Sequence, residues 1–171
     1  MKAVAAVGLG SNLESRFGDG RANLLEAVRQ VGELGEVRRV SSFYETEPVG
    51  VVEQPRFLNG ALVLETSLPP VELMRGLLAV EQAMGRVRGE AVAKGPRVID
   101  LDLLLYVDEN GGDVVMATEE LVLPHPEMQA RRFVLEPLVE IAPELVHPVL
   151  ALTVREMLER LRRVHQPTAE R

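Results

Sequence analysis

Residues 98–106 read VIDLDLLLY, the strongest strand signal in the chain. Side chains alternate between the two faces of a strand, so Asp100 and Asp102 are expected side by side on one face. The opposite face is expected to carry Ile99, Leu101, Leu103 and Leu105. Two adjacent carboxylates in a half-buried strand repel each other, so this face needs a cation close by.

The segments before residue 98 alternate between strand and helix patterns. Strands are predicted over residues 2–9, 36–46 and 57–66, the first of them running into a turn at residues 8–12. Helical spacing of apolar residues predicts helices from Arg21 to a stop at Gly35, and from Pro69 and Pro70 to Gly85. The order βαββαβ predicts an α+β, ferredoxin-like core, with two helices on one face of an antiparallel sheet.

The segments after residue 106 predict a C-terminal extension of this core. An acidic turn at residues 108–113 and a short strand at 114–117 indicate a hairpin. Apolar spacing predicts further helices at about 127–140 and over 153–164. The length of 171 residues suits a single domain spanning residues 1–171.

Composition excludes several classes of function. The net charge of −7 disfavours a basic surface for nucleic acid, and the absence of Cys excludes thiolate nucleophiles and disulfides. No segment approaches the roughly 20 apolar residues of a membrane span. The sequence therefore predicts a soluble, cytoplasmic protein that binds neither nucleic acid nor membrane. It leaves the oligomeric state open, with a monomer as the expected state.

A basic loop comes directly before the two aspartates. Four cationic residues oppose only Glu90 there: Arg86, Arg88, Lys94 and Arg97. Guanidinium groups bind phosphate, and Mg²⁺ held by carboxylates bridges phosphate oxygens, so the pattern favours phosphoryl transfer. Two plainer interpretations stay open: the cations neutralise the aspartates, or a solvated strand face binds nothing. No P-loop or G-x-G-x-x-G motif occurs, so the residues leave the class of nucleotide open.

Two further segments could contribute to such a site. His125 lies between two prolines, with Arg131 shortly after it, and would either pack a loop or complete a phosphate cage. Residues 46–59 offer backbone polar groups, the ring of Phe57 and the amide of Asn59, which by themselves make an ordinary loop. His147 and His165 have no such neighbours and are expected to be structural.

Six short sequence motifs, spread along the chain, match those of a known protein family in the same order. They are GSN at 10–12, SSFYETEP at 41–48, QP at 54–55 with FLN at 57–59, GRVR at 85–88, GPR at 95–97 with DLD at 100–102, and PHP at 124–126 followed by Arg131 and Phe133. Over residues 5 to about 148 the chain thereby resembles the 6-hydroxymethyl-7,8-dihydropterin pyrophosphokinase family. The resemblance implies transfer of pyrophosphate from ATP to the pterin hydroxymethyl group, with release of AMP, in folate biosynthesis.

The resemblance also implies a role for particular residues. Two Mg²⁺ ions would be held by Asp100 and Asp102, and these two join Arg86 and Arg97 as the expected catalytic residues. The residues expected at ATP are Glu81, Arg86, Arg88, Arg97, His125 and Arg131. The residues expected at the pterin are Thr46, Glu47, Pro48, Val49, Phe57, Asn59 and Phe133. The loops 47–56 and 86–96 are candidate lids that would exclude water.

The chain departs from the family pattern at two positions. Lys94 stands where some members carry an aromatic residue that helps to seal the site, and Arg132 stands where a small residue is common. Two other functions are alternatives to the pyrophosphokinase function. A non-catalytic ferredoxin-like sensor would bind a nucleotide or another small ligand without turnover. A metal-dependent enzyme acting on nucleic acid is disfavoured by the acidic net charge.

Overall fold

The computed structural model describes residues 2–46, 56–85 and 97–165. The elements, in chain order, are β1 (Ala3–Ser11), α1 (Gly20–Val31), β2 (Glu36–Val40), β3 (Tyr44–Thr46), β4 (Phe57–Thr66), α2 (Pro70–Ala83), β5 (Asp100–Val107), β6 (Met116–Ala117), β7 (Val122–Leu123), the 3-10 helix η1 (Met128–Ala130), α3 (Arg132–Ile141), β8 (Val146–His147), β9 (Leu152–Thr153) and α4 (Val154–His165). The α+β class is confirmed. Both candidate lid loops lie outside the described residues, except for Arg56 at the end of the first.

An antiparallel sheet forms the centre of the molecule. Its strand order is β2, β4, β1, β5, and β3 pairs with β4 beyond the end of β2. The single strand predicted over residues 36–46 is therefore wrong, because two strands lie there. At the break, the ring of Phe43 packs closely over Gly60, where a Cβ on this glycine would lie 2.8 Å from it.

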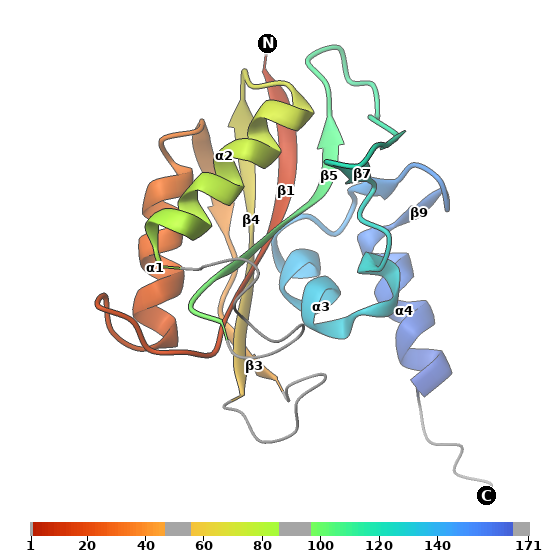
Figure 1. Ribbon diagram of the computed structural model, residues 1–171. Helices are drawn as coiled ribbons and strands as arrows, with labels where there is room; N and C mark the ends of the chain where they lie inside the picture. Colours follow the sequence, from red (N-terminus) through yellow and green to blue (C-terminus); the bar gives the residue numbers. More distant parts are fainter. Residues whose placement is uncertain (1, 47–55, 86–96, 166–171) are drawn as a thin grey trace, which may run out of the picture.

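Helices cover both faces of the sheet (Figure 1). One face packs against α1 and α2, as predicted, through side chains such as Leu24 and Leu77. The other face packs against α3 and α4, whose position the sequence left open, through side chains such as Leu138 and Leu158. The central strands of the sheet are thus covered on both sides, which agrees with the apolar run at residues 61–64 of β4.

A β-bulge changes the alternation of side chains along β5. Val7 of β1 lies opposite Leu103 and Ala6 lies opposite Leu105, so Leu104 is the extra residue. Leu105 consequently packs with Leu104 on the α3 side of the sheet. The prediction that Leu105 shares a face with Leu101 is wrong for this reason.

Three predicted boundaries also need correction. β1 continues through Gly8 and Gly10 to Ser11 instead of turning at residue 8, because all these residues pair with β4. α1 ends at Val31, before Gly35. The helix predicted over 127–140 is divided into η1 and α3, because the extended backbone of Arg131 (φ −120°, ψ 106°) interrupts it. Among the described residues, no helix combines the length and apolar character needed to cross a membrane.

His147 is expected to make stability depend on pH. Its side chain is buried, its Nδ1 accepts a hydrogen bond from the Leu150 backbone, and burial lowers its pKa below the ordinary 6.5. Below pH 6.5 the unfolded chain therefore binds the proton first, so the free energy of unfolding falls as pH drops from 6.5 toward the folded-state pKa.

The variant His147→Asn supplies an acceptor that does not titrate. Urea unfolding at about pH 7.5 and about pH 5.5 should show a smaller loss of stability on acidification in the variant than in the original chain. An equal loss in both proteins would contradict the assignment to His147.

Candidate active site

A cavity of about 570 Å³ lies between one end of the sheet and the first turn of α3. This volume is within the range of small-molecule sites. Side chains that line it come from separate elements: Thr46, Phe57 and Asn59 from β3 and β4, Asp100 and Asp102 from β5, and Arg131 and Phe133 from the start of α3, together with Arg97. The sequence predicted all of these as site residues, and the fold brings them together.

Two glycines of β1 form the floor of the cavity. Gly8 lies opposite Asp102, and Gly10 lies between Asp100 on one side and Asn59 on the other. A Cβ on Gly10 would lie 3.2 Å from the Asn59 Oδ1 atom, so a larger residue would crowd the site. Sequence reasoning took these glycines for a turn. Their spacing of two residues, which places both on one face of a strand, was the available signal.

The two aspartates share a face of β5, as predicted, and both border the cavity. The Asp100 carboxylate lies 3.1 Å from the Arg97 guanidinium, and the Asp102 carboxylate lies 4.0 Å from the His125 Nε2. Their side chains are 26% and 30% exposed, so both can reach a ligand. The cation expected beside this pair is thus present as Arg97.

The backbone of Arg97 is held by the end of β1. The Asn12 Oδ1 accepts its N–H at 2.7 Å, and the backbone N–H groups of Asn12 and Leu13 donate to its carbonyl oxygen. The Arg97 Nε is buried and has no hydrogen-bond partner among the residues that the structure describes. A donor left in this state is suited to an anionic oxygen of a ligand. Sequence reasoning did not foresee the role of Asn12.

His125 is fixed with one ring nitrogen directed at Asp102. Its Nδ1 accepts the backbone N–H of Glu127 at 3.2 Å. Burial lowers the pKa of His125, the positive charge of Arg131 lowers it further, and Asp100 opposes the shift. The ring is therefore neutral at pH 7, and its proton lies on Nε2, because Nδ1 acts as an acceptor. His125 does not line the first cavity; together with Asp102 it borders a second one, of about 230 Å³.

The cavity has an aromatic and amide side. Phe57 and Phe133 border it from β4 and α3, and the Arg131 guanidinium lies 5.5 Å from the centre of the Phe133 ring. The Asn59 Nδ2 donates to the Thr46 Oγ1, which fixes the orientation of the amide. Arg131 also pairs with Glu127. The two phenyl rings together with the Asn59 amide suit a flat ring with a polar edge.

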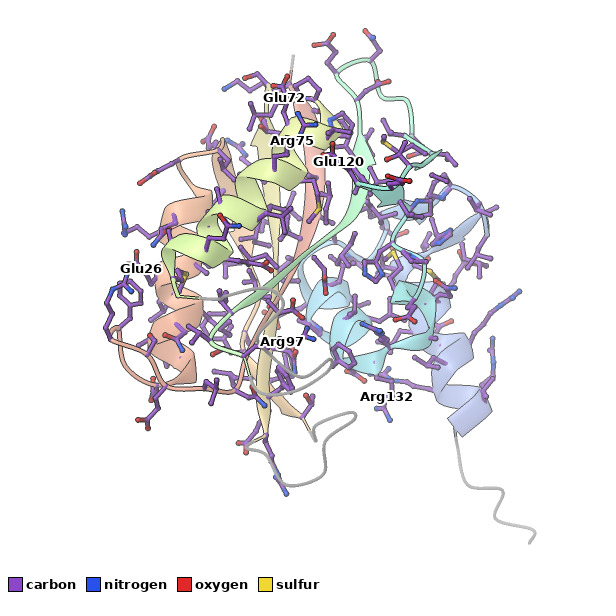
Figure 2. The ribbon with its side chains drawn as sticks, viewed as in Figure 1. Glu26, Glu72, Arg75, Arg97, Glu120 and Arg132 are labelled. Atoms are coloured by element: carbon purple, nitrogen blue, oxygen red, sulfur yellow. The ribbon has the colours of Figure 1, made fainter. Side chains whose placement is uncertain are left out.

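Other predicted site residues lie apart or outside the described residues. Glu81 of α2 is 1% exposed, does not border the cavity, and accepts the Leu101 backbone N–H at 2.7 Å. Arg86, Arg88, Lys94, Glu47, Pro48 and Val49 belong to segments that the structure does not describe. Arg132, one of the two departures from the family pattern, borders the cavity, and Figure 2 shows it at the same end of the molecule as Arg97.

No group of three or more His, Asp and Glu side chains that could hold a metal occurs within residues 2–46, 56–85 and 97–165. Mg²⁺ commonly takes one or two carboxylates and completes its coordination with water and phosphate oxygens. The carboxylates of Asp100 and Asp102, which both border the cavity, fit this mode of binding.

Comparison with known proteins agrees with this geometry. A family model described as 7,8-dihydro-6-hydroxymethylpterin-pyrophosphokinase (HPPK) matches residues 6–143. The chain belongs to the HPPK family. Enzymes named 2-amino-4-hydroxy-6-hydroxymethyldihydropteridine pyrophosphokinase are 43% identical in Methylorubrum extorquens, over 92% of both chains, and 42% identical in Synechocystis, over 92% of this chain and 75% of the relative.

Longer proteins also contain an HPPK-like part. The folic acid synthesis protein fol1 of Schizosaccharomyces pombe is 39% identical over 92% of this chain, which spans only 20% of that relative. A crystal structure of an HPPK-DHPS in complex with substrates superposes with a TM-score of 0.72 over the whole chain, at 15% identity, and this chain spans 45% of it. At that identity the likeness concerns the fold alone.

Proposed function

We propose that this chain transfers pyrophosphate from ATP to the hydroxymethyl group of 6-hydroxymethyl-7,8-dihydropterin, releasing AMP, as a step in folate biosynthesis. One observation carries the proposal: in an HPPK family chain, a single cavity is bordered by Phe57, Phe133 and Asn59 and also by a carboxylate pair with Arg97. The aromatic and amide side chains suit a flat heterocycle, and the charged side chains suit phosphates.

The pterin would lie between the two phenyl rings. Phe57 and Phe133 offer apolar faces for stacking, and Asn59 with Thr46 offers donors and acceptors for the polar edge of the ring. Because the Thr46 Oγ1 accepts one amide hydrogen, the Asn59 Oδ1 is left for a donor of the ligand. Glu47, Pro48 and Val49 are proposed to complete this rim.

The ATP phosphates would lie along β5. Arg97, Arg131 and the Nε2–H of His125 are the proposed donors, and Arg86 and Arg88 are proposed to join them from the preceding loop. The remainder of the nucleotide is proposed to extend toward the second cavity, which Asp102 and His125 border. Glu81 would influence ATP binding only indirectly, by fixing the Leu101 backbone through a hydrogen bond.

Asp100 and Asp102 are the residues that would hold two Mg²⁺ ions. Bound there, these ions supply neutralisation of charge on the phosphate oxygens. The chain's own residues orient the two substrates. Arg97 presents its guanidinium from a backbone fixed by Asn12. The aromatic side chains that border the cavity would hold the hydroxymethyl group on the same side of the sheet as the phosphates.

In the proposed reaction, the pterin hydroxyl oxygen attacks the β-phosphorus of ATP. A bond forms between this oxygen and phosphorus, the bond from the β-phosphorus to the oxygen shared with the α-phosphate breaks, and the hydroxyl proton is released. AMP leaves with that oxygen. No covalent enzyme intermediate is required, so the contribution of the protein is positioning and charge stabilisation.

The wider architecture is part of the proposal. The succession βαββαβ with the strand order β2, β4, β1, β5 supports a ferredoxin-like core. Both helical layers pack on one sheet, which supports a single pyrophosphokinase domain over residues 1–171. We propose a monomer as the working form.

Identification of the nucleotide product tests the proposal. With ATP, Mg²⁺ and the hydroxymethyl dihydropterin, chromatography should show one AMP and one diphosphorylated pterin for each ATP consumed, because the β-phosphorus is the centre attacked. Release of ADP would contradict the proposal. Binding of both ligands without any turnover would favour the sensor instead.

A further inference from the structure

Glu140, in the last turn of α3, holds a segment that is distant in sequence. Its carboxylate accepts the Ser42 backbone N–H at 3.0 Å, the Ser42 hydroxyl at 3.1 Å and the Tyr44 hydroxyl at 2.6 Å. Three donors on one carboxylate, from residues 96 and 98 positions away, form a defined attachment between α3 and the start of β3. None of the three residues borders the candidate active site.

The attached segment is also held from the opposite face of the sheet. Phe43 lies between Ser42 and Tyr44 and points the other way, with its ring over Gly60 and within 5.4 Å of the Arg21 guanidinium. Ser41 bonds Ala61 through both its backbone N–H and its hydroxyl. Because these contacts fix one side, Glu140 provides the complementary restraint on the side of α3.

The restraint leads directly to the proposed pterin rim. Tyr44 begins β3, which pairs with Asn59 and Phe57 of β4 and ends at Thr46. The Thr46 hydroxyl accepts the hydrogen bond that orients the Asn59 amide. A shift of the backbone at Ser42 and Tyr44 would therefore be passed along β3 to Thr46 and would change the orientation of the Asn59 amide.

The same helix carries the facing wall. Phe133 stands in the first turn of α3, seven residues before Glu140, which places the two on the same side of the helix, two turns apart. Phe133 borders the cavity, while the Glu140 carboxylate accepts a hydrogen bond from Tyr44 of β3. α3 thus connects one wall of the cavity to the strand that carries the other.

We infer that Glu140 is a positioning residue that sets the gap between the Phe133 wall and the Thr46 and Asn59 wall, and so determines affinity for the flat heterocycle. The inference rests on the proposed function, because that function assigns the pterin to this gap. Arg97 and the two aspartates belong to other elements, and their backbone contacts do not involve Glu140. The phosphate side should therefore not depend on it.

The variant Glu140→Gln keeps the size of the side chain but replaces one acceptor oxygen by an NH₂ group facing donors. We expect the KM for the pterin to rise about tenfold and the KM for ATP to stay within about twofold. Glu144→Gln is the matched control, because Glu144 lies four residues further on and, within the part of the chain that the structure describes, pairs with Arg155 alone, both side chains being exposed. It should leave both KM values unchanged.

Tyr44→Phe provides a second, independent variant, since it removes one donor and no charge. It should raise the pterin KM about threefold, and the double variant should resemble Glu140→Gln alone, because both changes break the same attachment. Thermal unfolding of each variant tests whether it is folded. If Glu140→Gln does not fold, the pterin KM of Tyr44→Phe tests the inference.

Direct titration of the pterin, with a non-hydrolysable ATP analogue present, separates this inference from the proposed function. A tenfold higher pterin Kd in Glu140→Gln supports the inference. Failure of the original chain to release AMP would overturn the proposed function but not the inference. An unchanged pterin Kd in folded Glu140→Gln and Tyr44→Phe, or equal weakening of pterin and ATP, would overturn the inference. Absence of pterin binding by the original chain would overturn both.

Discussion

Replacement of Asp102 by Asn should reduce AMP release by roughly a thousandfold or more, while the chain still folds. Asp102 borders both cavities and lies 4.0 Å from the His125 Nε2, so it stands where the phosphates of ATP are proposed to lie. The amide keeps the shape of the side chain but removes the charge that a divalent cation requires. Steady-state assays and circular dichroism measure the two parts of the expectation.

Two hypotheses for Asp102 make opposite forecasts. If the carboxylate only repelled a polyanion, Asp102→Asn would bind ATP more tightly and retain its rate. If it holds Mg²⁺, the variant should need much more Mg²⁺ and bind ATP more weakly at a given concentration of this ion. Asp113→Asn is a suitable control, because Asp113 is exposed and borders neither of the two cavities. A nearly normal rate in Asp102→Asn would refute the metal assignment.

The strand β4 could be predicted because residues 61–64 form a continuous apolar run suited to a strand buried on both faces. The bulge in β5 could not. Leu103, Leu104 and Leu105 are all apolar, so the pattern is satisfied whichever face each one occupies. Only the pairing with Ala6 and Val7 reveals where the alternation shifts. The break between β2 and β3 is hidden as well, since residues 41–43 between them contain neither glycine nor proline.

The paired aspartates of the candidate site could be predicted from residue type and spacing, whereas its aromatic residues could be predicted only from the family resemblance. Its supports could not. Asn12 acts on Arg97 across 85 residues, and Glu140 acts on Tyr44 across 96. Glu81 shows the converse: the family resemblance implies a contact with ATP, yet its carboxylate accepts the Leu101 backbone N–H inside the core. Hydrogen bonds between distant segments leave no local pattern.

The second large effect is expected at Arg97. Its backbone is held on both sides by Asn12 and Leu13, so a change of side chain should not move the chain itself. Arg97→Ala should lower kcat/KM for ATP by about a thousandfold, the order seen when a guanidinium that stabilises transferred phosphate is removed. Arg97→Lys should recover only part of this, because an ammonium keeps the charge and loses the planar fork that contacts two oxygens.

A comparison with Arg29 separates a role toward ATP from a role in neutralising Asp100. Arg29 pairs with Glu26 at the same spacing of three residues, but its side chain is 63% exposed, whereas that of Arg97 is 20% exposed with its Nε buried and unpaired among the described residues. Arg29→Lys should therefore leave kcat/KM unchanged. If Arg97 only neutralised Asp100, Arg97→Lys would retain nearly full activity, since a lysine still provides the positive charge. A large loss in this variant instead means that the geometry of the guanidinium, and not its charge alone, acts on the phosphates.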